Sequence, residues 1–201
     1  MNRSVAKRRV DSGNRIMKKI ISLFQRNIDT DRLVRNEIVP GAEWVIEGSG
    51  VATRKFDGTC CLVRDGKLYR RYDAKKGRRP PAGFEPAQAP DFKTGHWPGW
   101  LPVTDTPQDK YHWEAFHGKQ FDNGTYELCG PKIHGNPEKL SELVLVRHGA
   151  DFLPDCPRDF DGLKDYFQVQ DIEGVVWHHN DGRMVKIKGK DFGIRREWVD
   201  G

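Results

Sequence analysis

The chain has 201 residues, of which 36% are hydrophobic and 31% charged, and its formal net charge at neutral pH is +5. This length suits one domain with its own core, and the basic excess favours an anionic partner, nucleic acid first and nucleotides second. No apolar run reaches the roughly eighteen residues of a membrane-spanning helix, and the basic N-terminus lacks the apolar core of a secretion signal.

The four cysteines, at positions 60, 61, 129 and 156, argue against both a zinc site and a disulfide framework. They show no C-x-x-C spacing, and adjacent Cys60 and Cys61 would point to opposite faces of a strand. We therefore expect a protein of the reducing cytoplasm that has no contact with a membrane.

The N-terminal part divides into a tail and the start of a domain. Residues 1–15 are basic and lack periodicity, so we expect a flexible tail followed by one domain over 16–201. Apolar residues over 16–24 recur at helical spacing and predict a short amphipathic helix packed on the body. A strand beginning near Ile20 and a membrane-surface helix are the alternatives. Residues 33–54 suggest strands broken at Pro40-Gly41 and at residues 48–50.

A β-hairpin is predicted next. The strand 59–64 leads into Asp65-Gly66, a strong signal for a two-residue turn, and returns over 67–72. This turn predicts three cross-strand pairs: Arg64 with Lys67, Leu62 with Tyr69, and Cys60 with Arg71. The basic run that follows is either a solvated loop or an edge that contacts phosphates; it contains Lys75, Lys76, Arg78 and Arg79.

The middle of the chain predicts a long loop and several short elements. Residues 77–104 are rich in proline and glycine and are expected to form the loop. The other expectations, in chain order, are a helix from Thr106-Pro107 to about Phe116, a strand over 125–129, a helical turn from Asn136-Pro137 to about Leu143, a strand over 144–146 and a helix over 159–167.

A second hairpin is predicted near the end, with strands over 169–177 and 184–188 around a turn at 180–182. If Asp181-Gly182 are the central turn residues, Trp177 pairs with Lys186 and Val175 with Lys188, and Glu173 shares a face with both lysines. This polar face is either an exposed salt-bridged surface or a ligand-binding surface.

Lys55 is a candidate nucleophile. It precedes an apolar strand, follows Arg54 and is followed by Asp57-Gly58. An ammonium group cannot attack until it loses its proton, and both burial and neighbouring cations favour that loss. The alternative is an exposed lysine before a turn.

These segments resemble the motifs of the covalent nucleotidyltransferases, which include DNA ligases, RNA ligases and mRNA capping enzymes. The similar segments follow in order: Lys55-x-Asp57-Gly58, residues 126–130, residues 171–176 and residues 185–188. Residues 57–63, 98–103, 136–137, 148–150 and 173–178 are similar, more narrowly, to the vertebrate 5′-to-3′ RNA ligase family. The resemblance implies an α+β fold, the adenylation domain of ATP-dependent ligases, with mainly antiparallel sheets and flanking helices.

The resemblance also implies an activity. Lys55 would take AMP from ATP, AMP would pass to a 5′-phosphate RNA end, and a 3′-hydroxyl would then seal the bond. It implies that Glu127 accepts from the ribose hydroxyls and that Glu173 holds or orients Mg²⁺, which Mn²⁺ could replace. Lys186 and Lys188 would neutralise the phosphates and lower the pKa of Lys55. Arg54, Asp57, Gly58 and Arg71 would complete the nucleotide site, and the basic run over 75–79 is a candidate RNA surface.

Two departures from the motifs of the superfamily narrow the choice of enzyme class. DNA ligases usually carry an arginine five residues after the nucleophile, where this chain has Cys60. About fifteen residues follow Lys186, so we expect no C-terminal barrel domain of the kind that capping enzymes and DNA ligases use. An RNA ligase acting as a monomer is therefore the prediction. The alternatives are a ligase of nicked DNA and a non-catalytic nucleotide- or RNA-binding protein.

Overall fold

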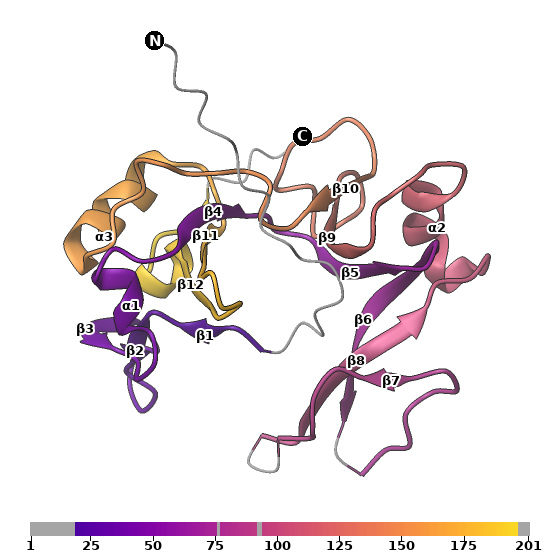
Figure 1. Ribbon diagram of the computed structural model, residues 1–201, viewed down its shortest axis with the longest axis horizontal. Helices are drawn as coiled ribbons and strands as arrows, with labels where there is room; N and C mark the ends of the chain where they lie inside the picture. Colours follow the sequence, from indigo (N-terminus) through magenta and orange to yellow (C-terminus); the bar gives the residue numbers. More distant parts are fainter. Residues whose placement is uncertain (1–18, 76, 92–93, 197–201) are drawn as a thin grey trace.

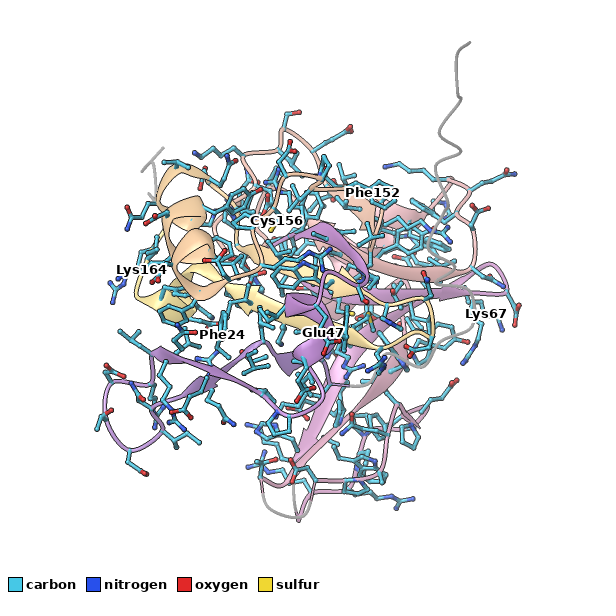
Figure 2. All side chains as sticks on the ribbon, turned by 60° about the vertical axis from the view of Figure 1, so that its left-hand side comes forward. Phe24, Glu47, Lys67, Phe152, Cys156 and Lys164 are labelled. Atoms are coloured by element: carbon cyan, nitrogen blue, oxygen red, sulfur yellow. The ribbon has the colours of Figure 1, made fainter. Side chains whose placement is uncertain are left out.

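Two main sheets dominate the computed structural model, which describes residues 19–75, 77–91 and 94–196. They lie side by side in Figure 1, and the chain crosses from one to the other where β4 leads into β5. Lys164 and Lys67, one in each half, lie on opposite sides of the molecule (Figure 2). Antiparallel pairing prevails and helices are few, as the predicted α+β class requires.

The first sheet has the strand order β1-β12-β11-β4, in which only β1 and β12 run parallel. Its strands are β1 (Ile21–Ser22), β4 (Val51–Lys55), β11 (Gly174–His178) and β12 (Met184–Lys188). The small sheet β2 (Phe24–Arg26) and β3 (Val34–Ile38) and the helices α1 (Glu43–Ile46) and α3 (Phe160–Val169) accompany it.

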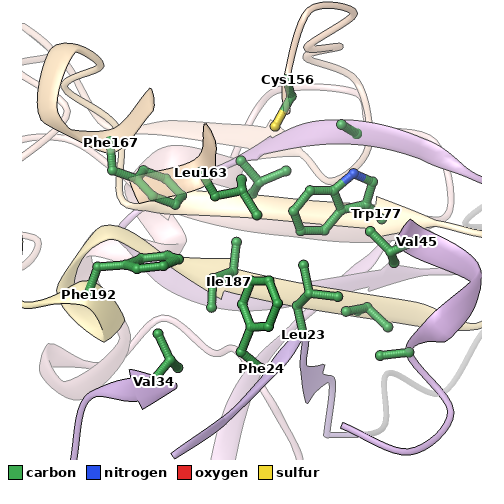
Figure 3. Packing of buried hydrophobic residues seen from close by; sticks show 14 of the residues in the cluster. Leu23, Phe24, Val34, Val45, Cys156, Leu163, Phe167, Trp177, Ile187 and Phe192 are labelled. Carbon is green, nitrogen blue, oxygen red and sulfur yellow. The ribbon is translucent and has the colours of Figure 1, made fainter. Parts of the chain in front are cut away.

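One face of the first sheet forms the main core. Val175 and Trp177 on β11 and Val185 and Ile187 on β12 recur at every second position, and all four are fully buried. Leu163 and Phe167 on α3, together with Phe24, pack against this face (Figure 3). The opposite face of the sheet is therefore left to the residues between them, which include the lysines of β12.

The second sheet has the order β10-β9-β5-β6-β8-β7. Its strands are β5 (Thr59–Arg64), β6 (Lys67–Lys75), β7 (Glu85–Pro86), β8 (His96–Pro102), β9 (Gly124–Cys129) and β10 (Val144–Arg147). The 3₁₀ helix η1 (Pro107–Asp109) and helix α2 (Lys110–Phe116) connect β8 to β9. A second 3₁₀ helix, η2 (Gly189–Phe192), follows β12. No helix in the described part of the chain is long and apolar enough to span a bilayer.

The first predicted hairpin is confirmed. Arg64 pairs with Lys67 and Leu62 with Tyr69, and the observed register continues to a Cys61–Arg70 pair, one step short of the predicted Cys60–Arg71 pair. Both turn residues have positive φ, 52° at Asp65 and 70° at Gly66. This is the conformation that an Asp-Gly hairpin turn requires.

Three predictions about the first hundred residues are wrong. Between the two breaks expected in the strands of residues 33–54, the chain forms helix α1. Residues 21–26 form strands instead of a helix, so the alternative of a strand near Ile20 holds; residues 1–18 lie outside the description. The expected loop over 77–104 contains β8, which pairs with β6 from Tyr69 to Lys75. Prolines 98 and 102 suggested a loop. However, β8 is almost an edge strand, because only the two-residue β7 pairs with its outer side, and edge strands tolerate proline.

The predicted second hairpin forms with its register shifted by one residue. Val176 pairs with Lys186 and Gly174 with Lys188, where Trp177 and Val175 had been expected. The cause is the turn: the His179 N–H donates to the Arg183 carbonyl at 2.9 Å, which encloses three residues. Gly182, at φ 91°, takes the left-handed position of that loop.

The remaining elements follow the predictions with two corrections. The helix predicted over 159–167 is α3, and Asp159 caps it by accepting from the Gly162 N–H at 2.8 Å. It extends to Val169, so the strand predicted to begin there starts only at Gly174. Turns replace the helical turn expected up to Leu143.

Gly174 supplies the first test. A Cβ at this position would overlap the Ile187 carbonyl oxygen of β12. We expect Gly174→Ala to lower the free energy of unfolding by about 1–3 kcal/mol through overpacking, measured by urea denaturation. Gly189→Ala is the control, because its Cβ would meet its nearest neighbours at ordinary van der Waals distance. Equal effects of the two substitutions would contradict this account of the strand pair.

Candidate active site

A row of residues across the first sheet places two lysines on either side of a glycine. Gly174 on β11 pairs with Lys55 on β4 and with Lys188 on β12. All three lie on the face opposite the core, because their neighbours Val175 and Ile187 are buried on the other face. Gly174 has no side chain, and β12 passes so close that a Cβ there would overlap the Ile187 carbonyl oxygen. Lys55 thus ends β4 and leads into β5; it was predicted at the start of a strand.

The Glu173 carboxylate links these two lysines. Glu173 immediately precedes β11, at a bend where the strand alternation has not begun. Its two carboxylate oxygens accept separately, Oε2 from Lys55 Nζ and Oε1 from Lys188 Nζ. The side chains of Lys55, Lys188 and Glu173 are only 21%, 18% and 11% exposed. The contact expected between Glu173 and the lysines therefore forms in spite of the register shift.

The pKa of Lys55 runs against the expectation from sequence. Burial lowers it, but the attraction of Glu173 and Glu127 outweighs burial and raises it above the ordinary lysine value. Lys186 is the lysine with the depressed pKa, at about 8, because it is buried and lies near Lys188 and Lys55. The prediction of a lowered pKa for Lys55 is therefore wrong.

A cavity of about 470 Å³ opens in front of these lysines. We call it the lysine cavity, and its polar lining includes Lys55, Lys186, Arg71, Glu127, Cys60 and His148. The buried Glu127 lies opposite Cys60 in the β5–β9 pair, and its Oε2 is 2.8 Å from His148 Nε2. Burial, reinforced by Glu127, raises the pKa of the Cys60 thiol to about 12. The cavity thus carries Lys55 and Lys186 from the first sheet and both Arg71 and Glu127 from the second.

The predicted basic residues on β6 are spread along that strand. Arg71 lines the lysine cavity with its guanidinium 4.9 Å from the centre of the Trp100 ring, and burial lowers its pKa. Lys75 ends β6 and is exposed, as are Arg78 and Arg79 beyond it. Lys76 lies outside the described residues.

Arg54 points away from the lysine row. Its guanidinium bonds to the Glu138 carboxylate, whose side chain is 1% exposed. Glu138 also accepts from Arg196 Nη1 and from the Asp57 N–H, both at 2.9 Å. One buried carboxylate therefore ties the residues on both sides of Lys55 to the C-terminal segment.

Asp57 and Gly58 do not line the lysine cavity. Asp57 lines a second cavity of about 630 Å³, which we call the glutamate cavity because Glu173 also lines it. Asp57 Oδ1 is 3.1 Å from His134 Nδ1. Gly58 lies so close to β9 that a Cβ there would overlap the Leu128 carbonyl oxygen. Gly58 thus serves the approach of the Lys55 segment to β9.

Sequence reasoning missed Glu138 and Arg196 and gave His148 no role. Glu138 lies in a segment of turns and Arg196 near the end of the chain. Their pairing spans 58 residues, and no local pattern signals it. His148, one residue beyond β10, was noted only as part of a motif.

Glu138 supplies the second prediction. Replacing it by glutamine leaves Arg54 and Arg196 without their shared buried anion. We expect unfolding free energy to fall by about 3 kcal/mol, the low end for a broken buried pair because both arginines keep some contact with water. Chemical denaturation measures the loss, with Glu142→Gln, at an exposed carboxylate, as the control. A loss no greater than that of the control would contradict the bracing role.

The third prediction concerns the two lysine pKa values. In protein whose lysines carry ¹³C-methyl groups, an NMR pH titration should show Lys186 titrating near pH 8 and Lys55 well above it. Glu173→Gln should lower the pKa of Lys55, since burial remains while the attraction is lost. Lys188→Met should raise the pKa of Lys186, since one repelling charge is lost. A Lys55 that titrates below Lys186 in the unmodified sequence would contradict the assignment.

Comparison with known proteins gives a consistent result. The family model for RNA ligase 1 matches residues 115–200, which include Glu127, Glu173, Lys186 and Lys188. RNA ligase 1 of Danio rerio is 27% identical over 222 residues, covering 72% of this chain and 67% of the relative. The Mus musculus protein is 27% identical and the Pongo abelii protein 26%, each covering 73% of this chain and 68% of the relative. The resemblance predicted from the motifs is confirmed: the chain is similar to the vertebrate-type RNA ligase 1 family.

Proposed function

We propose that this protein is an ATP-dependent RNA ligase that joins 5′-phosphate and 3′-hydroxyl ends through a lysyl-AMP intermediate. The observation that carries the proposal is the placing of Lys55 at a cavity with Lys186 and Arg71, in a chain related to RNA ligase 1. A triphosphate brings concentrated negative charge, and fixed cations in a partly dry site stabilise it.

The first step would form one bond and break another. The neutral amine of Lys55 attacks the α-phosphorus of ATP, the bond to the β-phosphate oxygen breaks, and pyrophosphate leaves. Lys55 must first lose both its proton and its contact with Glu173. Lys186 and Lys188 would offset the charge that develops on the phosphoryl oxygens.

The residues around Glu173 suit a magnesium ion. Glu173 and Asp57 line the glutamate cavity, and carboxylate oxygens with retained waters are the donors that Mg²⁺ prefers. When bound, the ion would add positive charge beside the phosphates, and Mn²⁺ could replace it. Glu173 is the residue we assign to holding it.

Glu127 would orient the sugar. Its carboxylate is buried at the wall of the lysine cavity, and a ribose hydroxyl could donate to it. His148 already contacts Oε2, so the ribose would use the remaining acceptor sites of the carboxylate. The cavity volume is within the range of sites that enclose small organic ligands.

The later steps need RNA beside the same cavity. The activated AMP passes from Lys55 to a 5′-phosphate, and a 3′-hydroxyl then attacks that phosphate and releases AMP. Lys75 on β6 pairs with His96 on β8, and His96 lines the lysine cavity. The exposed residues Lys75, Arg78 and Arg79 therefore extend from the rim of the cavity, and we assign them to the RNA backbone.

The fourth prediction tests the covalent step. With α-labelled ATP and Mg²⁺, the protein should become labelled, and Lys55→Ala should abolish the label because the acceptor nitrogen is gone. Lys186→Met should slow labelling roughly 100-fold, as expected for loss of one fixed cation. Lys164→Ala, an exposed lysine on α3, should leave labelling unchanged.

Three results would redirect the proposal. Absence of label, or label that survives Lys55→Ala, would contradict the lysyl-AMP mechanism and favour a non-catalytic nucleotide- or RNA-binding protein. Label from GTP and not ATP would point to guanylyl transfer. Sealing of nicked DNA in preference to RNA, measured with matched 5′-phosphorylated substrates, would overturn the assignment of RNA as substrate.

A further inference from the structure

Three potential metal ligands meet on the wall of the lysine cavity. They are the thiol of Cys60, the carboxylate of Glu127 and the imidazole of His148. One ligand atom from each lies within 4.8 Å of the other two. They are the only such group found among the described residues.

The sheet itself brings these side chains together. Cys60 on β5 is directly opposite Glu127 on β9, so both side chains stand on the same face. His148 continues from β10, the other neighbour of β9, and its N–H donates to the Thr125 carbonyl at 3.1 Å. The three ligands therefore come from two adjacent strands and from the residue that follows a third. The sheet brings them together although they are far apart in the sequence.

The imidazole has a ring nitrogen to spare. Nε2 is 2.8 Å from Glu127 Oε2, while Nδ1 is buried and has no hydrogen-bond partner in the part of the chain that the structure describes. Nε2, the nitrogen beside Glu127, is the one placed to bind a metal, and the buried Nδ1 calls for a partner of its own such as a water.

The ligand types select the metal. A thiolate and an imidazole suit zinc and its softer neighbours, whereas Mg²⁺ prefers oxygen donors alone. We propose that Cys60, Glu127 and His148 form a binding site for a zinc-class divalent cation, with its fourth position open to the lysine cavity. On binding, the Cys60 thiol releases its proton to solvent and the thiolate bonds to the metal.

Charge balance allows this binding beside a basic site. The thiolate and Glu127 together carry two negative charges, which neutralise the divalent ion. Lys55 and Arg71 nearby oppose a bare cation, but a neutralised centre adds little to their repulsion. Zinc bond lengths of about 2.0–2.3 Å place tetrahedral ligand atoms roughly 3.3–3.7 Å apart. His148 Nε2 and Glu127 Oε2, which are 2.8 Å apart, would separate slightly, and the Cys60 sulfur would adjust from its place within 4.8 Å of both.

Occupancy would block nucleotide binding. A bound metal ion would occupy the Glu127 carboxylate, which could then no longer accept from the ribose. The open ligand position of the ion would face the lysine cavity, where we propose that the nucleotide binds. We therefore expect Zn²⁺ to inhibit labelling by ATP even when Mg²⁺ is in large excess. This consequence rests on the proposed function; metal binding itself does not.

The fifth prediction separates these two parts. Metal-stripped full-length protein is titrated with Co²⁺, and a thiolate-to-cobalt charge-transfer band should appear and then vanish as Zn²⁺ displaces cobalt. Calorimetric titration with Zn²⁺ in the presence of Mg²⁺ gives the affinity. Cys60→Ser should remove the band, and Cys60→Ser and His148→Gln should each weaken Zn²⁺ binding about 100-fold or more, since loss of even an outer-shell partner costs 10- to 100-fold.

Cys156→Ser is the matched control, because Cys156 is a buried free cysteine in the other core. It should keep both the band and the affinity, and circular dichroism should show that every variant is folded. Absence of the band, or a band that persists in Cys60→Ser and is lost in Cys156→Ser, would overturn the site. If the protein binds Zn²⁺ but is not labelled by ATP, the metal site would be supported and the proposed function rejected. ATP labelling that resists Zn²⁺ at saturating occupancy would reject the inhibitory role.

Discussion

The site depends on one carboxylate shared by two ammonium groups. Glu173 accepts from both Lys55 and Lys188 in a largely buried position, next to the glycine that pairs with each of those lysines. Two cations share one anion there, and Lys186 adds a third positive group nearby. Burial and, after it, this excess of positive charge lower the pKa of Lys186. A strongly anionic ligand would relieve this repulsion, and this supports our proposal that a triphosphate binds here.

The rest of the fold keeps that arrangement in place. Trp177 and Ile187 fix β11 and β12 from the core side, so the lysines of β12 must face outward. On the other side of Lys55, the buried Glu138 holds the residues that flank it. The same sheet geometry that frames the nucleotide cavity also aligns a thiol, a carboxylate and an imidazole along its wall, which makes metal inhibition a property of the cavity itself.

Sequence reasoning succeeded where short-range patterns determine the outcome. Asp65-Gly66 gave the register of the first hairpin, and the alternation along 184–188 placed Lys186 and Lys188 on one face. It failed where distant segments decide. A three-residue loop shifted the second hairpin by one, and β8 was hidden by its prolines. No local sequence pattern signals the Glu138–Arg196 pair. The cysteine spacing gives no sign of the cluster of Cys60, Glu127 and His148, because these residues come from three separate segments of the chain.

The central claim is that Lys55, and no other lysine of the cavity, carries the AMP. Lys186 is its direct competitor, because a pKa of about 8 makes it the more readily deprotonated amine. The most direct measurement incubates the protein with ATP and Mg²⁺, digests it and locates the added AMP by tandem mass spectrometry. The account predicts AMP on the peptide containing Lys55 alone. AMP on Lys186, or on no lysine, would contradict it.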